Sequence, residues 1–219
     1  ERYTVWRIYD SKIYRYAGTG LQGDTGDGGP ALQASFADEL WSLSCDGAGN
    51  LYIMDRRNLW VRQIDAEGPE PIIRRIVGNI DKIPGYSGDG DPLDALLSSW
   101  PFGLHTTADG TVYFCDTGNQ CIRRVAADRL SIETVAGRGI GDTVPGDGRG
   151  PLDASFATPM DVWRTPDGKI YVADSGNRRV RRYSPPPEDS PEAFGIVETV
   201  AGNDQVGSGC SDIDADTSV

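Results

Sequence analysis

Aspartate carboxylates gather with glycines in three loops of the sequence, and this grouping could do chemistry. The loops read GDTGDGGPALQASF (23–36), SGDGDPLDALLS (87–98) and PGDGRGPLDASF (145–156). Calcium prefers several carboxylates together with carbonyl oxygens of the kind that glycine turns set free. The candidate ligands, which would also make this face acidic, are Asp24, Asp27, Asp89, Asp91, Asp94 and Asp147. No loop matches the twelve-residue calcium loop with its terminal Glu, and Gly-Asp pairs are common in turns. We therefore expect structural turns and no cofactor, with calcium binding as the alternative.

A second set of charged residues recurs along the chain at matching positions. Aspartates end three strand-like segments, at Asp55, Asp116 and Asp174. The strand-like segment after each of these carries an arginine, and a matching arginine occurs near the start of the chain, which gives Arg7, Arg62, Arg123 and Arg181. A ring of such charges could bind a ligand. A residue that is present in every repeat more often serves the repeat itself. We expect hydrogen bonds from each Asp to an Arg or to backbone within one unit.

Cysteine and histidine offer little further chemistry. The chain has four cysteines and a single histidine, His105. Cys115 and Cys121 flank the turn DTGNQ, where residues opposite one another in a hairpin can be bridged, so we predict a disulfide between them. One cysteine pair without nearby histidines supplies too few ligands for zinc. We predict no catalytic residue in this chain.

An internal repeat of about 60 residues positions all of these groups. Four units begin with similar four-residue segments, RYAG, RIVG, TVAG and TVAG. The last residues of these segments are Gly18, Gly78, Gly137 and Gly202. Each of the first three leads into an Asp/Gly loop, a hairpin-like pair of strands, a tight turn (RRN, TGN or SGN) and an arginine-bearing strand. We interpret each unit as four short strands that begin with the RIVG-type segment. Tandem four-stranded antiparallel units are typical of β-propeller blades.

The same residues resemble the NHL repeat, in a variant with a long Asp/Gly loop. The third unit matches best, above all in YVADSGNRRVRRY (171–183), and the resemblance covers roughly residues 3–205. It implies a β-propeller, usually six-bladed, that serves mostly as an interaction platform. The first unit departs from the pattern because RRN (56–58) stands where a TGN-type turn is expected. We expect the tryptophans to pack between blades, with one or two available for stacking on a ligand.

The chain is predicted to be a single all-β propeller region of about three and a half blades. The expected parts are a blade remnant at 1–14, blades at about 15–74, 75–132 and 133–197, and a partial blade at 198–219 that starts with an inner strand near Val200. Closed propellers have ~4–8 blades. We therefore expect a protein partner, either another copy or the remainder of a longer chain, to complete the ring.

Composition narrows the function. The 219 residues include 28 glycines, and 33 acidic against 21 basic side chains give a net charge of −12, which disfavours nucleic acid as a partner. No apolar run is long enough to span a membrane as a helix. We predict a non-catalytic, extracellular or cell-surface scaffold for protein interaction, within a larger surface protein or fibre. The alternative is a propeller enzyme of the lyase or hydrolase type whose metal ligands lie outside this chain.

Overall fold

Short antiparallel strands joined by glycine-rich turns make up the regular structure. The computed structural model describes residues 2–137, 139, 146–185 and 195–203. Its strands are β1 (Val5–Tyr9), β2 (Lys12–Ala17), β3 (Leu40–Cys45), β4 (Leu51–Asp55), β5 (Trp60–Ile64), β6 (Ile73–Val77), β7 (Leu104–Thr106), β8 (Val112–Asp116), β9 (Cys121–Val125), β10 (Ile132–Ala136), β11 (Pro159–Arg164), β12 (Ile170–Asp174), β13 (Arg179–Ser184) and β14 (Ile196–Ala201).

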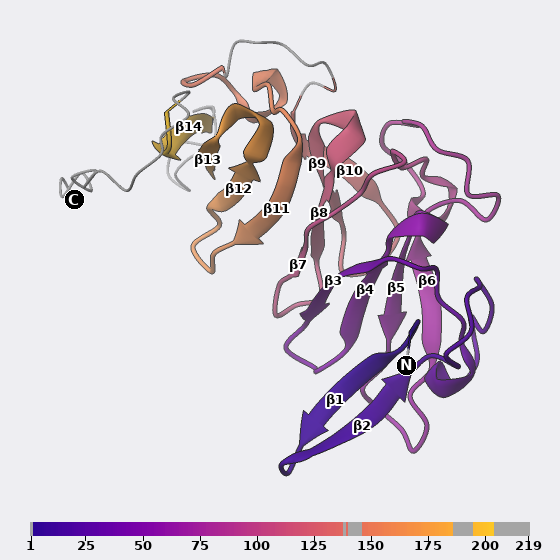
Figure 1. The fold of residues 1–219 in the computed structure, drawn as a ribbon. Helices are drawn as coiled ribbons and strands as arrows, with labels where there is room; N and C mark the ends of the chain where they lie inside the picture. Colours follow the sequence, from indigo (N-terminus) through magenta and orange to yellow (C-terminus); the bar gives the residue numbers. More distant parts are fainter. Residues whose placement is uncertain (1, 138, 140–145, 186–194, 204–219) are drawn as a thin grey trace.

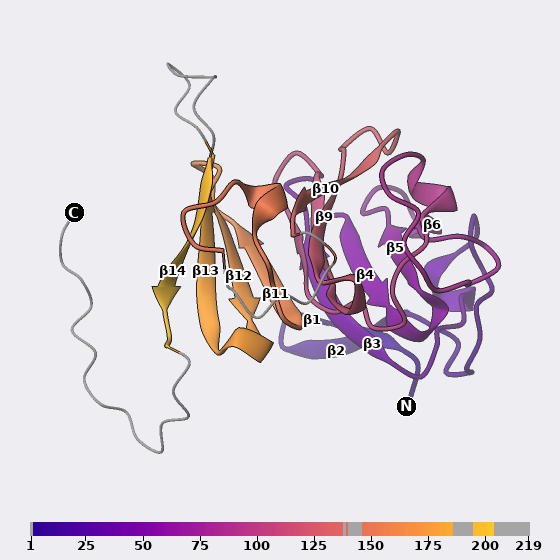
Figure 2. The same ribbon diagram turned by 90° about the horizontal axis from the view of Figure 1, so that it is seen from above.

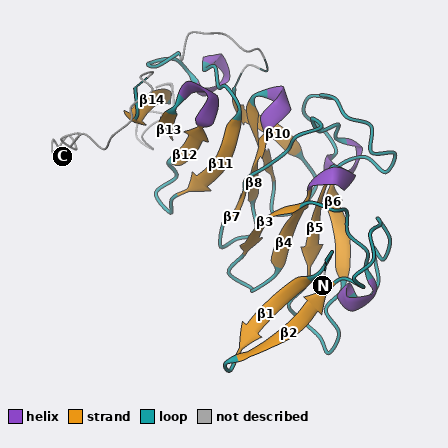
Figure 3. Cartoon of the chain, viewed as in Figure 1, coloured by secondary structure: helices purple, strands orange, loops and turns teal. Residues whose placement is uncertain are grey.

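Single 3₁₀ turns are the only helical elements in the described residues, and Figure 3 shows them at the ends of strands and within the long loops. They are η1 (Ala31–Gln33), η2 (Arg56–Asn58), η3 (Pro92–Asp94), η4 (Thr117–Asn119), η5 (Pro151–Asp153) and η6 (Ser175–Asn177). No helix of this part of the chain is long and apolar enough to cross a membrane.

The strands form three four-stranded antiparallel sheets and one two-stranded sheet. The sheets are β3-β4-β5-β6, β7-β8-β9-β10, β11-β12-β13-β14 and β1-β2. Figure 1 shows them side by side along an arc, from β1-β2 at one end to β11–β14 at the other, and Figure 2 shows the arc from above. The predicted all-β fold of propeller blades is confirmed.

The order of strands within each sheet differs from our prediction. Strands β3, β7 and β11 contact one another on the inner side of the arc, and β6, β10 and β14 form the outer edges. The RIVG-type strand therefore closes one sheet and does not open the next, and β14, which contains Val200, is an outer strand. The complete sheets span 40–77, 104–136 and 159–201, so the predicted blade boundaries are shifted by one strand. Residues 204–219 of the predicted partial blade lie outside the described residues.

Apolar side chains fill the spaces between neighbouring sheets. One cluster joins the first and second complete sheets, with Met54 and Val61 against Leu104 and Phe114. Corresponding clusters join the second sheet to the third, and the two-stranded sheet to the first. Each blade is stabilised by its neighbours in this way, as in other repeat proteins.

A clasp between a left-handed residue and a glycine closes each blade. Leu59, Gln120 and Arg178 follow the η turns with φ of 56°, 54° and 54°. The carbonyl of Gln120 lies so close to Gly137 that a Cβ there would be 2.5 Å from the carbonyl oxygen, so only glycine fits. Gly78 and Gly202 make the same approach to Leu59 and Arg178.

The clasp corrects the placement of Arg7. Tyr3 has a φ of 58° and approaches Gly18 as Leu59 approaches Gly78, so the two are equivalent. Trp6 then lies opposite Arg15 in the β1–β2 register, as Arg62 lies opposite Arg75. Arg7 is one residue out of phase and exposed, because a one-residue shift turns a strand side chain to the other face.

Candidate ligand-binding rim

Each complete sheet buries one of the recurring Asp–Arg pairs. The distance from the arginine Nη1 to the aspartate Oδ2 is 3.6 Å for Arg62–Asp55, 3.6 Å for Arg123–Asp116 and 3.3 Å for Arg181–Asp174, and all six side chains are inaccessible to solvent. The aspartates also accept hydrogen bonds from the backbone N–H groups of Ala37, Ser98 and Ala157. These charges lie inside the blades and form no ligand-binding ring.

The buried aspartates have altered acidity. Burial raises the pKa of Asp55 to about 6, against the opposing effects of hydrogen bonds from Asn58 and Ala37 and the charge of Arg62. Burial also raises the pKa of Asp116. Asp55 is still mainly ionised at neutral pH, which suits its ion pair with Arg62.

The Asp/Gly loops supply a second carboxylate to the same arginines. Arg62 Nη2 donates to Asp27 Oδ1 at 2.7 Å, and Arg181 Nη2 donates to Asp147 Oδ1 at 2.5 Å. Asp89 Oδ1 lies 4.0 Å from Arg123 Nη2 and accepts a hydrogen bond from Thr134 N. Each buried arginine therefore lies between the aspartate that ends a strand of its own sheet and the loop that enters this sheet from the preceding one.

The remaining loop aspartates are also engaged or dispersed. Asp24 pairs with Lys82, Asp91 accepts a hydrogen bond from Leu93 N at the start of η3, and Asp94 is exposed within η3. In the described parts of the chain, no three His, Cys, Asp or Glu side chains gather to hold a metal ion. The structure does not bring the predicted calcium ligands together there.

The predicted disulfide is wrong. Cys115 and Cys121 are both free and buried. The register pairs Cys115 with Ile122 and Cys121 with Asp116, so the two cysteines are offset by one residue and point to opposite faces of the sheet. Burial raises the pKa of both thiols. Cys45 is free and exposed, and Cys210 lies outside the described residues.

Four of the five tryptophans expose aromatic surface that the sequence analysis expected to be packed mostly between blades. Trp60 is buried, with 1% of its surface exposed, and its indole N–H donates to the Asn79 carbonyl at 2.8 Å. The others are about half exposed, at 45% for Trp6, 50% for Trp41, 57% for Trp100 and 60% for Trp163. Exposed aromatic side chains indicate a binding site only where they gather into one patch.

Trp41 and Trp100 belong to an aromatic cluster around a buried arginine. Arg56, the first residue of η2, has its guanidinium carbon 4.8 Å from the ring centre of Trp100, 4.7 Å from that of Phe102 and 5.7 Å from that of Trp41. Trp41 meets Phe102 edge to face at 4.6 Å between ring centres. The cluster lies where β3 and the segment before β7 meet, beside the inner strands of the arc.

Charged side chains surround this cluster. Arg56 forms an ion pair with Glu39, and Arg57 Nη2 lies 3.0 Å from Glu39 Oε1 and its Nε 3.9 Å from Asp38 Oδ1. The Arg56 side chain is 5% exposed, its buried Nε has no hydrogen-bond partner, and burial lowers its pKa. We call Arg56, Trp41, Trp100 and Phe102, with Glu39, the aromatic rim.

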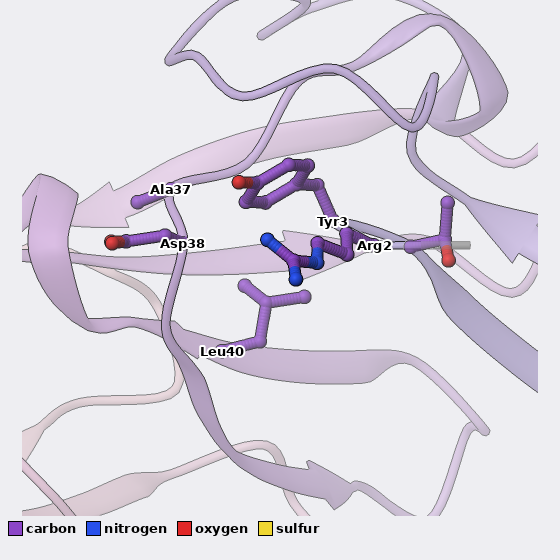
Figure 4. Close-up of a pocket in the computed structure, with 6 residues that line it drawn as sticks. Arg2, Tyr3, Ala37, Asp38 and Leu40 are labelled. Atoms are coloured by element: carbon purple, nitrogen blue, oxygen red, sulfur yellow. The ribbon is translucent and has the colours of Figure 1, made fainter.

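A hollow lies on the other side of the same segment (Figure 4). Arg2, Tyr3 and Thr4, which lead into β1, face Ala37, Asp38 and Leu40, which lead into β3, across a cavity of about 470 Å³. The Arg2 side chain projects into the hollow between Tyr3 and Leu40.

The signal that could have located the rim is the departure of RRN from the repeat. Arg56 stands where the other blades carry Thr117 and Ser175, as the first residue of the η turn. Thr117 donates a hydrogen bond to the Pro159 carbonyl of the next blade at 2.6 Å. A long charged side chain cannot make that short contact, and in the first complete blade it instead extends among three aromatic rings.

Comparisons with known proteins support the fold. No protein-family model matches the chain. It is 24% identical over 191 residues to the chloroplastic protein SUPPRESSOR OF QUENCHING 1 of Arabidopsis thaliana, an alignment that covers 82% of this chain and 17% of that protein. A solved auxiliary nutrient binding protein from Bacteroides thetaiotaomicron has a TM-score of 0.62 and 19% identity, and the match covers 83% of this chain and 42% of that one.

A second solved structure is an enzyme. Virginiamycin B lyase from Staphylococcus aureus, in a catalytically inactive form, has a TM-score of 0.50 and 16% identity, covering 94% of this chain and 50% of the lyase. The chain thus spans half or less of these relatives. Our prediction that the module is not an enzyme is overturned by this comparison, because proteins of the same propeller fold include both binding proteins and enzymes.

Proposed function

We propose that this chain is an NHL-type segment of a β-propeller that binds a protein ligand through the aromatic rim. The NHL assignment is supported by the three concordant repeat units and by the propeller fold of similar structures. It agrees with the recurring turn that ends in asparagine, because Asn58 and Asn119 each donate to the strand-end aspartate and to the carbonyl of a glycine, Gly23 or Gly85, at or just before the Asp/Gly loop.

The observation that carries the binding proposal is the exposure of Trp41 and Trp100 around the buried Arg56. Tryptophan and arginine are enriched among the residues that contribute most to protein–protein affinity. Their aromatic faces are held in place by Phe102 and by the ion pair of Arg56 with Glu39, so little conformational entropy is lost when a partner binds. The surrounding Asp38 and Arg57 give the site the polar border that is typical of protein interfaces.

The repeat supports a functional origin for this cluster. A residue shared by all blades stabilises the repeat, whereas Arg56 occurs in one blade only. Because arginine stands in place of a small hydroxyl residue, the first complete blade lacks the inter-blade hydrogen bond that Thr117 makes in the next blade. Such a local departure from a stabilising pattern is expected at functional sites.

The proposal concerns binding and holds whether or not the complete propeller also catalyses a reaction. The extracellular or cell-surface location stays a prediction, and the free cysteines give it no support.

A peptide-display selection tests the proposal. Peptides selected on the wild-type protein should bind Trp41→Ala and Trp100→Ala variants at least about tenfold more weakly, a loss of about 1.4 kcal/mol. Trp163→Ala is the matched control, because Trp163 is equally exposed and lies outside the cluster. Circular dichroism and thermal unfolding would establish that the variants are folded. If no selected peptide depends on Trp41 or Trp100, the proposal is wrong.

A further inference from the structure

A cleft lies between the second and third complete sheets, beside the turns of the hairpins β7–β8 and β11–β12. The two hairpins are neighbours along the arc (Figure 1). The cleft has a volume of about 410 Å³, and it is lined by both turns and by the last residues of β7 and β11, which are His105, Thr106, Trp163 and Arg164. Described residues of two complete sheets therefore form both of its walls.

The cleft is open because its two turns do not make a contact that joins the preceding pair of turns. In the turn after β3, Gly47 N donates to the Ala108 carbonyl of the next sheet at 3.0 Å, and a Cβ on Gly47 would lie 2.7 Å from that oxygen. Such a close approach of two backbones requires glycine. Ala108 takes the equivalent position in the turn after β7, and among the described residues no backbone hydrogen bond joins it to Pro166 in the turn after β11.

Two aromatic rings form one side of the cleft. The ring centres of His105 and Trp163 are 4.1 Å apart, with an angle of 42° between the ring planes. Trp163 is 60% exposed, and Ala108 and Pro166 add apolar surface beside it. A planar ring suits this wall, because stacked or edge-to-face contacts between aromatic rings stabilise beyond the burial of their area.

The cleft also holds a cation that has no anion. The other arginines in the strands of the complete sheets have a carboxylate or carbonyl partner for the guanidinium. Within the part of the chain that the structure describes, the partly buried Arg164 has neither, and its guanidinium carbon lies 5.9 Å from the ring centre of Tyr113. An arginine stays protonated and can donate two parallel hydrogen bonds to a carboxylate.

The carboxylate that lines the cleft does not neutralise Arg164 by contact. Asp109 Oδ1 accepts hydrogen bonds from Thr107 Oγ1 at 2.5 Å and from Thr111 N at 3.0 Å, and its Oδ2 accepts one from Thr111 Oγ1 at 3.2 Å. Asp109 is therefore held within its own turn. Thr106, which also lines the cleft and is 4% exposed, has a buried hydroxyl without a hydrogen-bond partner among the described residues.

We propose that this cleft binds a small aromatic carboxylate, whose ring packs against Trp163 and His105 and whose carboxylate pairs with Arg164. The volume lies in the lower part of the range for small-molecule sites, which suits a ligand of one or two fused rings. The site is separate from the aromatic rim, because Phe102 of the rim precedes β7 and the cleft lies where β7 ends.

A titration with 2-naphthoate tests the proposal, with the neutral 2-naphthamide as the matched control ligand. His105 is the only histidine of the chain, so the carbon-bound protons of its ring report binding at the cleft in proton NMR. We expect a saturable shift of these signals by 2-naphthoate with a Kd of about 0.1–1 mM. The amide has the same rings without the charge and should bind at least about fivefold more weakly.

Variants assign the two halves of the ligand. Arg164→Gln should remove the preference for 2-naphthoate over 2-naphthamide, and Trp163→Ala should weaken both ligands at least about fivefold. Arg74→Gln, at an arginine that is 52% exposed in the first complete sheet, should bind as the wild type does. Trp41→Ala should also bind normally, which separates this inference from the proposed rim function.

Three results would overturn the inference. The first is no shift of the His105 signals at about 5 mM 2-naphthoate, and the second is equal affinity of the wild type for the acid and the amide. The third is an Arg164→Gln protein that unfolds thermally as the wild type does and keeps the full preference for the acid.

Discussion

Arg62 Nη2 and Asp27 Oδ1 lie 2.7 Å apart across 35 residues of sequence, and this bond ties an Asp/Gly loop to the third strand of the following sheet. The loop composition suggested metal binding, but its central carboxylate already has a cation. The same relationship recurs between Arg181 and Asp147. The loop aspartates therefore neutralise the buried arginines of the blades. Replacing one of these aspartates should lower the free energy of unfolding by a measurable amount.

Asp27→Asn should lower the free energy of unfolding by about 1–3 kcal/mol, the range for a hydrogen bond to a charged group. The reason is that Arg62 stays buried with one fewer anion beside it. Urea unfolding followed by tryptophan fluorescence measures the change. Asp24→Asn is the matched control, since its pair with Lys82 is at the surface and should contribute about 0–1 kcal/mol. Equal losses in the two variants would contradict the assignment.

Arg56→Ala, which removes the guanidinium and supplies no hydroxyl in its place, should lower the free energy of unfolding by about 1–3 kcal/mol. The loss comes from a cation among three aromatic rings and from its ion pair with Glu39, which keeps Arg57 as a partner. Arg57→Thr should change it by less than about 1 kcal/mol, because Arg57 is 53% exposed. Thermal and urea unfolding provide the measurement, and a larger effect at Arg57 would show that the cluster is misassigned.

Thiol reactivity should distinguish Cys45 from the two buried cysteines. In a Cys210→Ser protein, Ellman's reagent should titrate one thiol in the native state, at the exposed Cys45, and three after denaturation without reductant. Cys115 and Cys121 are protected because burial excludes the reagent and raises their pKa. Only one thiol after denaturation would mean that a disulfide joins the two.

Acidification should destabilise the protein through His105. Burial lowers the pKa of this imidazole below its ordinary value of 6.5, and its ring lies 4.1 Å from that of Trp163. At a pH just below 6.5, His105 is protonated in the unfolded chain but not in the folded one. The contribution of His105 to the free energy of unfolding is therefore lost as pH falls through 6.5 towards the folded-state pKa.

The contribution is isolated by comparing wild type with His105→Gln at several pH values between 7 and 5. The difference matters because Asp55, whose pKa is raised, acts in the opposite direction over part of this window. Proton NMR of the single histidine reports its pKa directly. A pKa above 6.5 in the folded protein would refute the prediction.

The sequence was sufficient for the strands and insufficient for their grouping. Glycine turns and alternating apolar residues located the hairpins, and the aspartates and arginines of the repeat do meet in pairs. A periodic pattern has no privileged starting point, so it could not tell whether the strand before Gly78 opens one sheet or closes another. That question is decided by hydrogen bonds between β5 and β6.

Single-residue offsets explain the other errors. The sequence alignment made Arg7 equivalent to Arg62. The contact of Tyr3 with Gly18 instead makes Trp6 the residue equivalent to Arg62. Cys115 and Cys121 looked opposite because they flank a turn, but a left-handed Gln120 between η4 and β9 shifts the pairing. The rim was missed because Arg56, Trp41 and Trp100 come from separate parts of the sequence and meet only after two sheets pack.

The shift between sequence repeat and sheet has a consequence for how such a chain can grow. Each unit of about 60 residues begins in the outer strand of one sheet and ends in the third strand of the next. A tandem duplication of one unit would therefore add a sheet that shares a sequence unit with the sheet before it. Both faces of the added sheet would be copies of faces that already pack against a neighbour, so no new interface is needed. The number of blades could then change in one genetic step while the packing between blades stays the same.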